Sequence, residues 1–276
     1  MKLNKKIQNI LVFSLWSLAV IGLLVVLGFT SKALDHRSVS KVDIEIKNID
    51  EHQFITNENV LALLHENNPE LIGSNMENVD IARIERMYNT NPYIANAEVF
   101  KKINGELQIE ITTKRPIARI INFNNESFYL DEDGYLMPWS SQYTADLPVF
   151  TGNIYESYDL CNSINYSKID INDSVLIKNN LYGIYLFAKY LASNEFWNAQ
   201  IVQVFIDKDV ELIPRAGSHT IVLGDFRDID SKMNNLFKFY QTGLSKVGWN
   251  IYEKINLKYK NQIICTKISA NKELEN

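Results

Sequence analysis

The sequence of 276 residues predicts an α+β fold with an N-terminal transmembrane helix, a β-α-α-β-β module, and a mainly antiparallel β-domain with covering helices. Three observations lead to this prediction. An uncharged apolar run opens the chain, two helix patterns separate an alternating strand from a hairpin, and short strand patterns interrupted by helices fill the remainder. The expected segments are a tail at 1–9, an anchor at 10–31, the module at 40–114, the β-domain at 116–268 and a polar tail at 269–276.

The anchor is predicted from residues 10–29, "ILVFSLWSLAVIGLLVVLGF", which contain no charged side chain. At about 1.5 Å per residue, a helix of this length matches a hydrocarbon core of roughly 30 Å. A cleaved signal peptide usually has a shorter apolar core followed by small residues, and the following "TSKALD" lacks that pattern. Lys2, Lys5 and Lys6 precede the run, so the positive-inside rule places the N-terminus in the cytoplasm and the rest of the chain outside the inner (plasma) membrane.

The charge of the exported part argues against a nucleic-acid partner. Beyond residue 31 the chain carries 25 basic and 33 acidic side chains. A nucleic-acid-binding domain needs a basic face. The composition therefore excludes that class of function.

The β-α-α-β-β module begins with a strand, because Val42, Ile44 and Ile46 alternate with charged residues. "FITNENVLALLHENNP" follows as a helix with Thr56 as its N-cap, and "VDIARIERMYN" as a second helix. The two strands in "AEVFKKINGELQIEITTKRP" are joined by Asn104-Gly105, a dipeptide that type I′ hairpin turns favour. Two helices are thus expected to cover one face of a small sheet.

The β-domain is predicted after Pro116 from a series of shorter signals. "SFYLDEDGYLMP" is a hairpin pattern turning at Asp133-Gly134, and a long helix is expected over 174–193. Three strands are expected in "IVQVFID", "DVELIPR" and "HTIVLG", followed by a helix that begins near Asp230. The last pair of strands lies in "INLKYKNQIICTK", with its turn at "KNQ".

No set of residues predicts catalysis, a metal site or a cofactor. His65-Glu66 begins like a zinc-protease motif, but no histidine follows at the required spacing. "DEDG" at 131–134 lacks the further oxygen ligands of a calcium loop and is typical of a hairpin turn. Nucleophile elbow, glycine-rich phosphate loop and Cys-x-x-Cys motifs are missing from the sequence. We therefore expect a protein that is not an enzyme.

The two cysteines, Cys161 and Cys265, leave two alternatives open. An oxidising compartment would allow one disulfide between them. Lone cysteines at unrelated spacing are also common as buried free thiols. Spacing in the sequence does not decide between these states.

The final strand is the remaining candidate site, because an uncovered edge strand offers main-chain groups to another chain. If it is an edge, Ile263 and Cys265 point to one face of the sheet, and Ile264 and Thr266 to the other. Lysines just before the turn would then offer a basic flank to an acidic partner. The alternative is an inner strand that the domain covers itself.

The order of these segments resembles the FtsQ/DivIB family of bacterial cell-division proteins, which carry one membrane span, an extracytoplasmic POTRA domain and a β-domain. The residues that carry the resemblance are "FITNENVLALL", "LIGSNMENVDIARIERMYNTNPYIANAEVFKKINGELQIEITTKRPIARI", "FYLDEDGYLMP", "LPVFTGN", "VELIPRAGSHTIVLGD", "DSKMNNLFKFYQTGL" and "INLKYKNQI". The resemblance covers residues 8–268, although residues 153–172 match nothing in the family pattern. It identifies the 40–114 module as the POTRA domain.

The resemblance implies a non-enzymatic scaffold of the divisome, located at the division septum. Such proteins recruit the FtsB–FtsL pair, which adds a strand to the last β-strand of the β-domain in the periplasm or its equivalent. The POTRA domain and the anchor would help bring the protein to the septum, and the POTRA domain would be available to other division proteins. By position, the implied partner-binding residues are Lys258, Tyr259, Ile263, Ile264, Cys265, Thr266 and Lys267.

Two other functions are compatible with parts of the sequence. A POTRA-type chaperone of envelope protein assembly would carry several such modules or a following barrel. An anchored peptidoglycan-active enzyme would need a convergent set of catalytic groups.

Overall fold

The computed structural model describes residues 13–25, 37–47, 53–169 and 179–268. Within these ranges, no helix has both the length and the apolar character that crossing a membrane requires. Residues 13–25 of the predicted anchor are helical, and its remaining residues lie outside the described ranges, as do the predicted tails at 1–9 and 269–276. The anchor stays a prediction.

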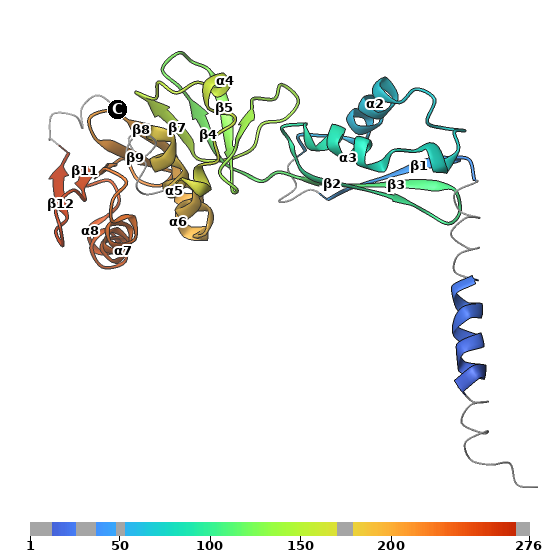
Figure 1. The fold of residues 1–276 in the computed structure, drawn as a ribbon. Coiled ribbons are helices and arrows are strands. Elements are labelled where there is room, and N and C mark those ends of the chain that lie inside the picture. Colours follow the sequence, from blue (N-terminus) through green and yellow to red (C-terminus); the bar gives the residue numbers. More distant parts are fainter. Residues whose placement is uncertain (1–12, 26–36, 48–52, 170–178, 269–276) are drawn as a thin grey trace, which may run out of the picture. The chain divides into compact units, whose positions relative to one another are not determined.

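The chain forms two compact units, and each is described by itself. The first unit consists of Met1–Asn48 and Ile55–Thr113, and the second of Ile49–Phe54 and Lys114–Asn276. Figure 1 labels the elements of both units.

The first unit has the predicted β-α-α-β-β order. Its elements are β1 (Lys41–Lys47), α2 (Asn57–Asn67), a short 3-10 helix (Met76–Asn78), α3 (Ile81–Asn89), β2 (Ile94–Lys101) and β3 (Glu106–Thr113). The strand order is β1-β3-β2, with β1 parallel and β2 antiparallel to the central β3. The two α-helices lie on the same face of this sheet (Figure 1).

Local chemistry explains where these elements begin and turn. Thr56 caps α2 as predicted, because its hydroxyl accepts from the N–H of Asn59 while the Asn59 side chain accepts from the N–H of Thr56. Gly105 has φ +86°, a backbone conformation that suits glycine in the β2–β3 turn. The inward side chains of β3, Leu107, Ile109 and Ile111, are fully buried under the helices.

The second unit is built on a sheet with the strand order β12-β11-β10-β9-β8-β7-β4-β5-β6. The strands are β4 (Pro116–Ile121), β5 (Ser127–Asp131), β6 (Leu136–Pro138), β7 (Val149–Gly152), β8 (Ile201–Ile206), β9 (Val210–Pro214), β10 (Thr220–Gly224), β11 (Tyr252–Asn256) and β12 (Ile264–Lys267). Most neighbours are antiparallel, but β4–β7, β7–β8 and β10–β11 are parallel. The sheet is therefore mixed.

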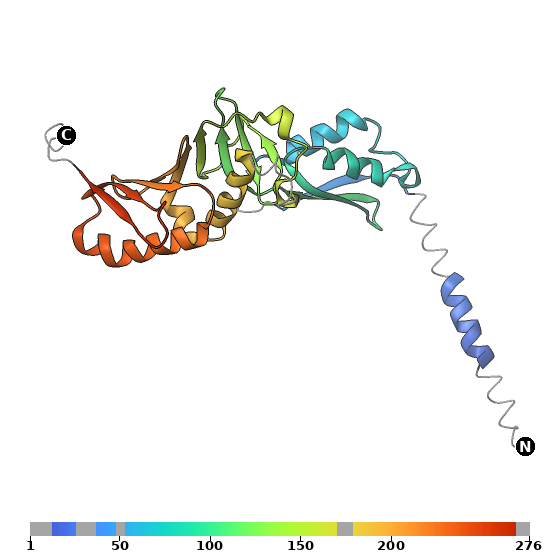
Figure 2. The same cartoon turned by 60° about the vertical axis from the view of Figure 1, so that its left-hand side comes forward.

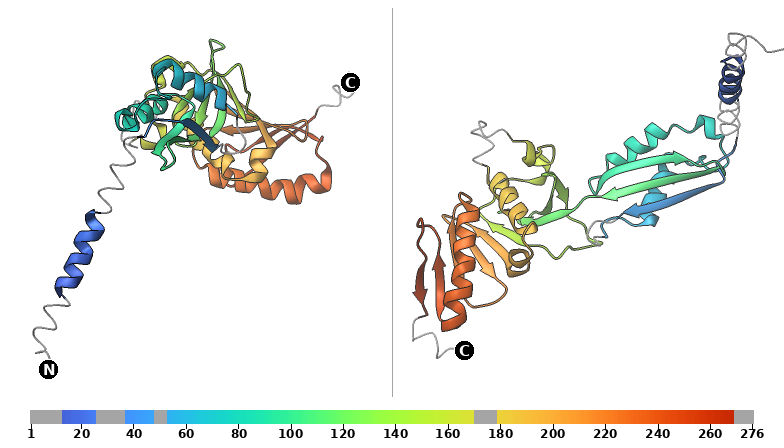
Figure 3. Two further views of the ribbon diagram at one scale, coloured as in Figure 1. Left: turned by 90° about the vertical axis from the view of Figure 1, so that its right-hand side faces the viewer. Right: turned by 90° about the horizontal axis from the view of Figure 1, so that it is seen from below.

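Helices complete the core of the second unit. They are α4 (Tyr158–Cys161), a 3-10 turn (Tyr166–Lys168), α5 (Asn180–Ala192), α6 (Glu195–Gln200), α7 (Ile229–Phe239), a π-helical turn (Tyr240–Leu244) and α8 (Ser245–Val247). Side chains from α5, α6 and α7 are buried against the inner face of the sheet. Figure 2 shows α7 running alongside the β11–β12 hairpin, and the right-hand view of Figure 3 shows the same arrangement.

Two helix predictions need correction. The helix expected over 174–193 begins at Asn180, because the Asn179 side chain accepts from the N–H of Leu181 and caps it there; residues 174–178 lie outside the described ranges. The helix expected near Asp230 begins at Ile229, as predicted, but it changes to a π-helical turn at Tyr240.

Candidate partner-binding edge

The last strand lies at one end of the nine-stranded sheet. β12 pairs antiparallel with β11, and in the described part of the chain no second strand lies beside it. This is the position expected for a strand that receives a foreign segment.

The register shows which peptide groups of β12 face outward. The N–H of Ile268 donates to the carbonyl of Ile251 at 3.1 Å, so the peptide groups of Ile268 face β11. Successive residues of an antiparallel strand alternate between facing the neighbour and facing away. By this alternation Thr266 and Ile264 bond to β11, whereas the N–H and C=O groups of Cys265 and Lys267 point to the free edge.

The outward N–H groups of β12 are not closed by side chains. Among the described residues, no side chain accepts a hydrogen bond from the N–H of Cys265 or Lys267. The register shifts between Tyr252 and Lys254, so that the pairing of β11 with Thr266 includes a bulge. The bulge lies on the inner strand and leaves the alternation along β12 unchanged.

The side chains of β12 divide between two faces, as the sequence predicted. Ile263 and Cys265 are half-buried and pack against the core. Ile264 is 46% exposed, and Thr266 and Lys267 are exposed as well. The inner face therefore holds the strand in place, while the outer face offers Ile264 and Thr266 next to the open edge. Lys267 belongs by alternation to the face of Cys265 but lies exposed at the end of the strand.

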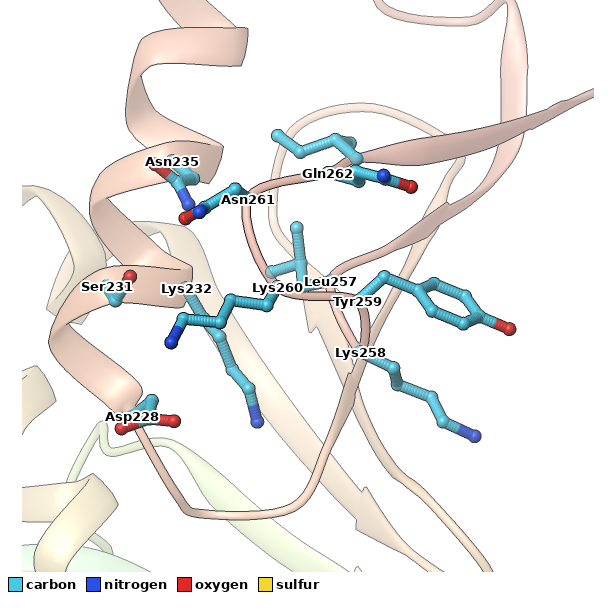
Figure 4. A pocket seen from close by; sticks show the side chains of 11 residues that line it. Asp228, Ser231, Lys232, Asn235, Leu257, Lys258, Tyr259, Lys260, Asn261 and Gln262 are labelled. Atoms are coloured by element: carbon cyan, nitrogen blue, oxygen red, sulfur yellow. The ribbon is translucent and has the colours of Figure 1, made fainter.

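The connection between β11 and β12 is a tight turn at the predicted "KNQ". The N–H of Gln262 donates to the carbonyl of Tyr259 at 3.2 Å, and Asn261 has φ +59°, a conformation that asparagine tolerates better than most residues. Buried Leu257 holds the start of the turn by donating to Val222 of β10 at 2.9 Å. The Tyr259 ring is 53% exposed and points away from α7 (Figure 4).

Lys258 is tied to its own domain. Its Nζ lies 2.8 Å from Asp209 Oδ1, and this hydrogen bond raises the pKa of the Lys258 ammonium. Its stem passes over Gly224, where an added Cβ would lie 2.6 Å from Lys258 Cγ. The Lys258 ammonium therefore already has a carboxylate partner, whereas the exposed Lys260 has none among the described residues.

A pocket of about 200 Å³ lies between the turn and the first half of α7 (Figure 4). In the figure the Lys260 side chain extends toward α7, and Asn261 faces Asn235. The full lining is Asp228, Ser231, Lys232, Asn235, Leu257, Lys258, Tyr259, Lys260, Asn261, Gln262 and Ile263. Most of these residues are polar in type, although polar and apolar atoms contribute about equally to the walls, and they include no pair of groups arranged for acid–base or nucleophilic chemistry.

The other motifs considered in the sequence have structural roles. In "DEDG", the N–H of Gly134 donates to the carbonyl of Asp131 at 3.1 Å, which closes the β5–β6 turn. His65 lies in the last turn of α2. In the described ranges no three His, Cys, Asp or Glu residues are grouped to hold a metal ion. Cys161 and Cys265 are both free thiols, and burial raises the pKa of each.

Three residues that support the edge were not found by sequence reasoning. Asp209 and Gly224 hold Lys258, and the Asn256 side chain accepts from the N–H of Lys258 at 2.9 Å. Asn256 lies two residues before Lys258, a spacing typical of an Asx-turn, so a local signal existed. The contributions of Asp209 and Gly224 depend on the pairing of distant strands and have no local signal.

Comparison with known proteins connects this architecture to a family. The family model for FtsQ/DivIB, C-terminal related, matches residues 115–266, and the model of the POTRA-like domain matches residues 37–112. A cell division protein FtsQ from Geotalea daltonii (strain DSM 22248 / JCM 15807 / FRC-32) is 25% identical over 201 residues, which cover 71% of this chain and 66% of the relative. The match thus spans slightly less than two thirds of that relative's length.

The first match covers the whole β-domain from β4 to β12 and more than half of the chain, and the second covers the β-α-α-β-β unit. The chain belongs to the FtsQ/DivIB family.

Proposed function

We propose that this protein is a non-enzymatic, membrane-anchored scaffold of the cell-division machinery that recruits the FtsB–FtsL pair by strand addition to β12. The observation that carries the proposal is the open edge of β12, where the N–H and C=O groups of Cys265 and Lys267 face outward. Family membership and the name of the similar FtsQ protein support the division role.

Strand addition would take its affinity from main-chain hydrogen bonds and its specificity from alternate side chains. An incoming segment would bond to the peptide groups of Cys265 and Lys267. Its outward side chains would lie beside Ile264 and Thr266, which are exposed on the same face. The half-buried Ile263 and Cys265 would keep the receiving strand in register with the core.

The far end of the sheet is a poorer receiver. β6 has only three residues and ends in Pro138, which has no N–H to donate. Short strands and proline are common means of blocking sheet edges. β12 is therefore the end of this sheet that is better suited to a partner strand.

The charges around the edge favour an acidic partner segment. Lys258, Lys260 and Lys267 surround it, and all three are exposed. Because Lys258 is already paired with Asp209, we assign it a smaller share of the attraction than Lys260 and Lys267. Exposed charges of this kind are screened by salt, so the contribution should fall with ionic strength.

The anchor at 10–31 would hold the protein in the inner (plasma) membrane, with residues 1–9 in the cytoplasm and the POTRA domain at 40–114 and β-domain at 116–268 outside. The basic residues before the apolar run support this orientation. Through this arrangement the receiving strand would meet partners that are themselves anchored at the septum.

The test is capture of FtsB–FtsL by the full-length chain and by two truncations. Removal of 262–276 deletes β12 and should abolish capture, whereas removal of 270–276 leaves β12 and should preserve it. Retained capture without β12 would refute the strand-addition mechanism, provided that the POTRA domain remains folded in both truncations.

The division role has its own test in cells. A fluorescent fusion should form a ring at mid-cell, and a uniform membrane signal would contradict the role. Clearing of a peptidoglycan gel by sub-stoichiometric protein would instead favour the anchored-enzyme alternative.

A further inference from the structure

The POTRA sheet also ends in a strand with outward peptide groups. β2 lies at one end of the order β1-β3-β2. The N–H of Lys102 donates to the carbonyl of Glu106 at 2.8 Å, which shows that Lys102 faces β3. By the alternation of the antiparallel pair, the N–H groups of Ala97, Val99 and, at the end of the strand, Lys101 face away from β3. They are the donors that an added strand would use.

The two central donors, the N–H groups of Ala97 and Val99, are occupied by side chains of α3. The N–H of Ala97 donates to Asn89 Oδ1 at 2.9 Å, and the N–H of Val99 donates to Glu85 Oε1 at 3.0 Å. Residues four positions apart lie on the same side of a helix, and two donors two positions apart lie on the same edge of a strand. One helix face therefore matches the two central outward donors of β2.

The occupied donors make β2 different from β12. A foreign strand at β2 would have to displace a carboxylate oxygen and an amide oxygen before it could form its own bonds. Hydrogen bonds to a charged acceptor are stronger than those between neutral groups, so Glu85 is the harder contact to replace. At β12 the corresponding N–H groups of Cys265 and Lys267 have no side-chain acceptor among the described residues.

We propose that Glu85 and Asn89 close the β2 edge of the POTRA domain to foreign strands and so act as specificity-determining residues that keep the strand-adding partner of β12 away from β2. The second part of this inference rests on the proposed function of β12. The closure of β2 itself can be tested without any division partner.

The experiment uses the full-length protein in detergent with Glu85→Ala and Asn89→Ala combined. Amide exchange at Ala97 and Val99 should become about tenfold faster, the change expected for the loss of a hydrogen bond of ordinary net strength. The opened edge should also bind a fluorescent peptide with the β3 sequence "ELQIEITT", because β3 is the strand that β2 already pairs with. We expect binding at least about tenfold tighter than to the parent protein, since two donors become available.

Two control variants distinguish the loss of the side-chain acceptor oxygen from other effects of substitutions in α3. Glu85→Gln keeps an acceptor oxygen and should leave exchange and peptide binding close to the parent values. Arg86→Ala removes an exposed side chain from the same helix and should also leave amide exchange and peptide binding close to the parent values. If the double variant loses cooperative unfolding, the single variants Glu85→Ala and Asn89→Ala each free one donor and are used in its place.

Unchanged exchange at both amides would overturn the proposal, because the side chains would then not hold the donors. Faster exchange without peptide capture or self-association would also overturn it, because an open β2 edge would then not accept strands. Neither result would affect the β12 proposal, which is tested by FtsB–FtsL capture alone.

Discussion

Proline at two adjacent positions of β12 should separate partner binding from folding. Lys267→Pro removes an N–H that faces the free edge, and Thr266→Pro removes one that bonds to β11. Both side chains are exposed, so little packing changes in either variant. Proline is tolerated at edge positions where the N–H points away from the sheet, and it breaks the ladder elsewhere.

The two variants should differ in which free energy they change: Lys267→Pro mainly that of partner binding, and Thr266→Pro mainly that of unfolding. Lys267→Pro should change the free energy of unfolding by less than about 1 kcal/mol, since no bond within the protein is lost. It should weaken binding of FtsB–FtsL by about 1–3 kcal/mol, the cost of leaving the partner's carbonyl unpaired, which is roughly a 5-fold to 150-fold rise in Kd. Thr266→Pro should itself destabilise the β-domain by about 1–3 kcal/mol through the lost ladder bond and steric conflict.

The assay is a titration of FtsB–FtsL onto the full-length protein, combined with chemical denaturation of each variant. Lys267→Gln is the matched control because it removes the charge and keeps the N–H. If Lys267→Pro binds within twofold of the Lys267→Gln variant, the outward N–H of residue 267 is not used, and the register inferred for the added strand is wrong.

Three further predictions concern the stability of the two units to denaturation. Gly224→Ala should lower the free energy of unfolding by about 1–2 kcal/mol, because φ is +86° and the new methyl group would displace Lys258. Asp209→Asn, which only breaks the exposed ion pair, should have a smaller effect in the same denaturation assay. Burial lowers the pKa of His219, whose Nε2 lies 2.8 Å from Tyr240 Oη, so the unfolded state binds more protons than the folded state. The free energy of unfolding should therefore fall as the pH drops below the ordinary histidine pKa of about 6.5. In a His219→Gln variant the free energy of unfolding should fall less steeply between about pH 6.5 and 5, and an equally steep fall would show that His219 is not the group responsible. Thr56→Ala should destabilise the POTRA domain by about 1 kcal/mol in thermal denaturation, whereas Thr56→Ser should restore the cap.

The elements that the sequence predicted well are those with local causes. The alternation of Val42, Ile44 and Ile46 and the Asn104-Gly105 dipeptide each determine a strand or turn within a few residues. The same is true of the turn at Asn261, where one residue must adopt positive φ. Short-range sterics and capping decide these features, so one sequence is sufficient to predict them. The predicted type I′ geometry of the Asn104-Gly105 turn is wrong, because Gly105 has positive φ and Asn104 does not.

Features that depend on distant residues could not be predicted in this way. The parallel pairing of β10 with β11 joins strands separated by α7, the π-helical turn and α8, and nothing in either strand specifies that neighbour. The Glu85 and Asn89 contacts require the orientation of α3 relative to β2 as well as the β2 register. For the same reason the ion pair of Lys258 with Asp209 was not predicted, although Lys258 itself was a candidate residue.

Burial decreases from the interior of the sheet toward its open end. Ile255 and Leu257, on β11 and just after it, are 0% and 3% exposed, whereas Ile263 and Cys265 are only half-buried and Ile264 is exposed. Segments with few buried apolar contacts open at lower free energy than the core. A bound strand would cover the free peptide groups and part of these apolar side chains, and would therefore order β12 as well as bind to it. The ordering cost reduces the affinity of the strand contact, so binding would depend on additional contacts, such as those of the exposed lysines with an acidic partner segment.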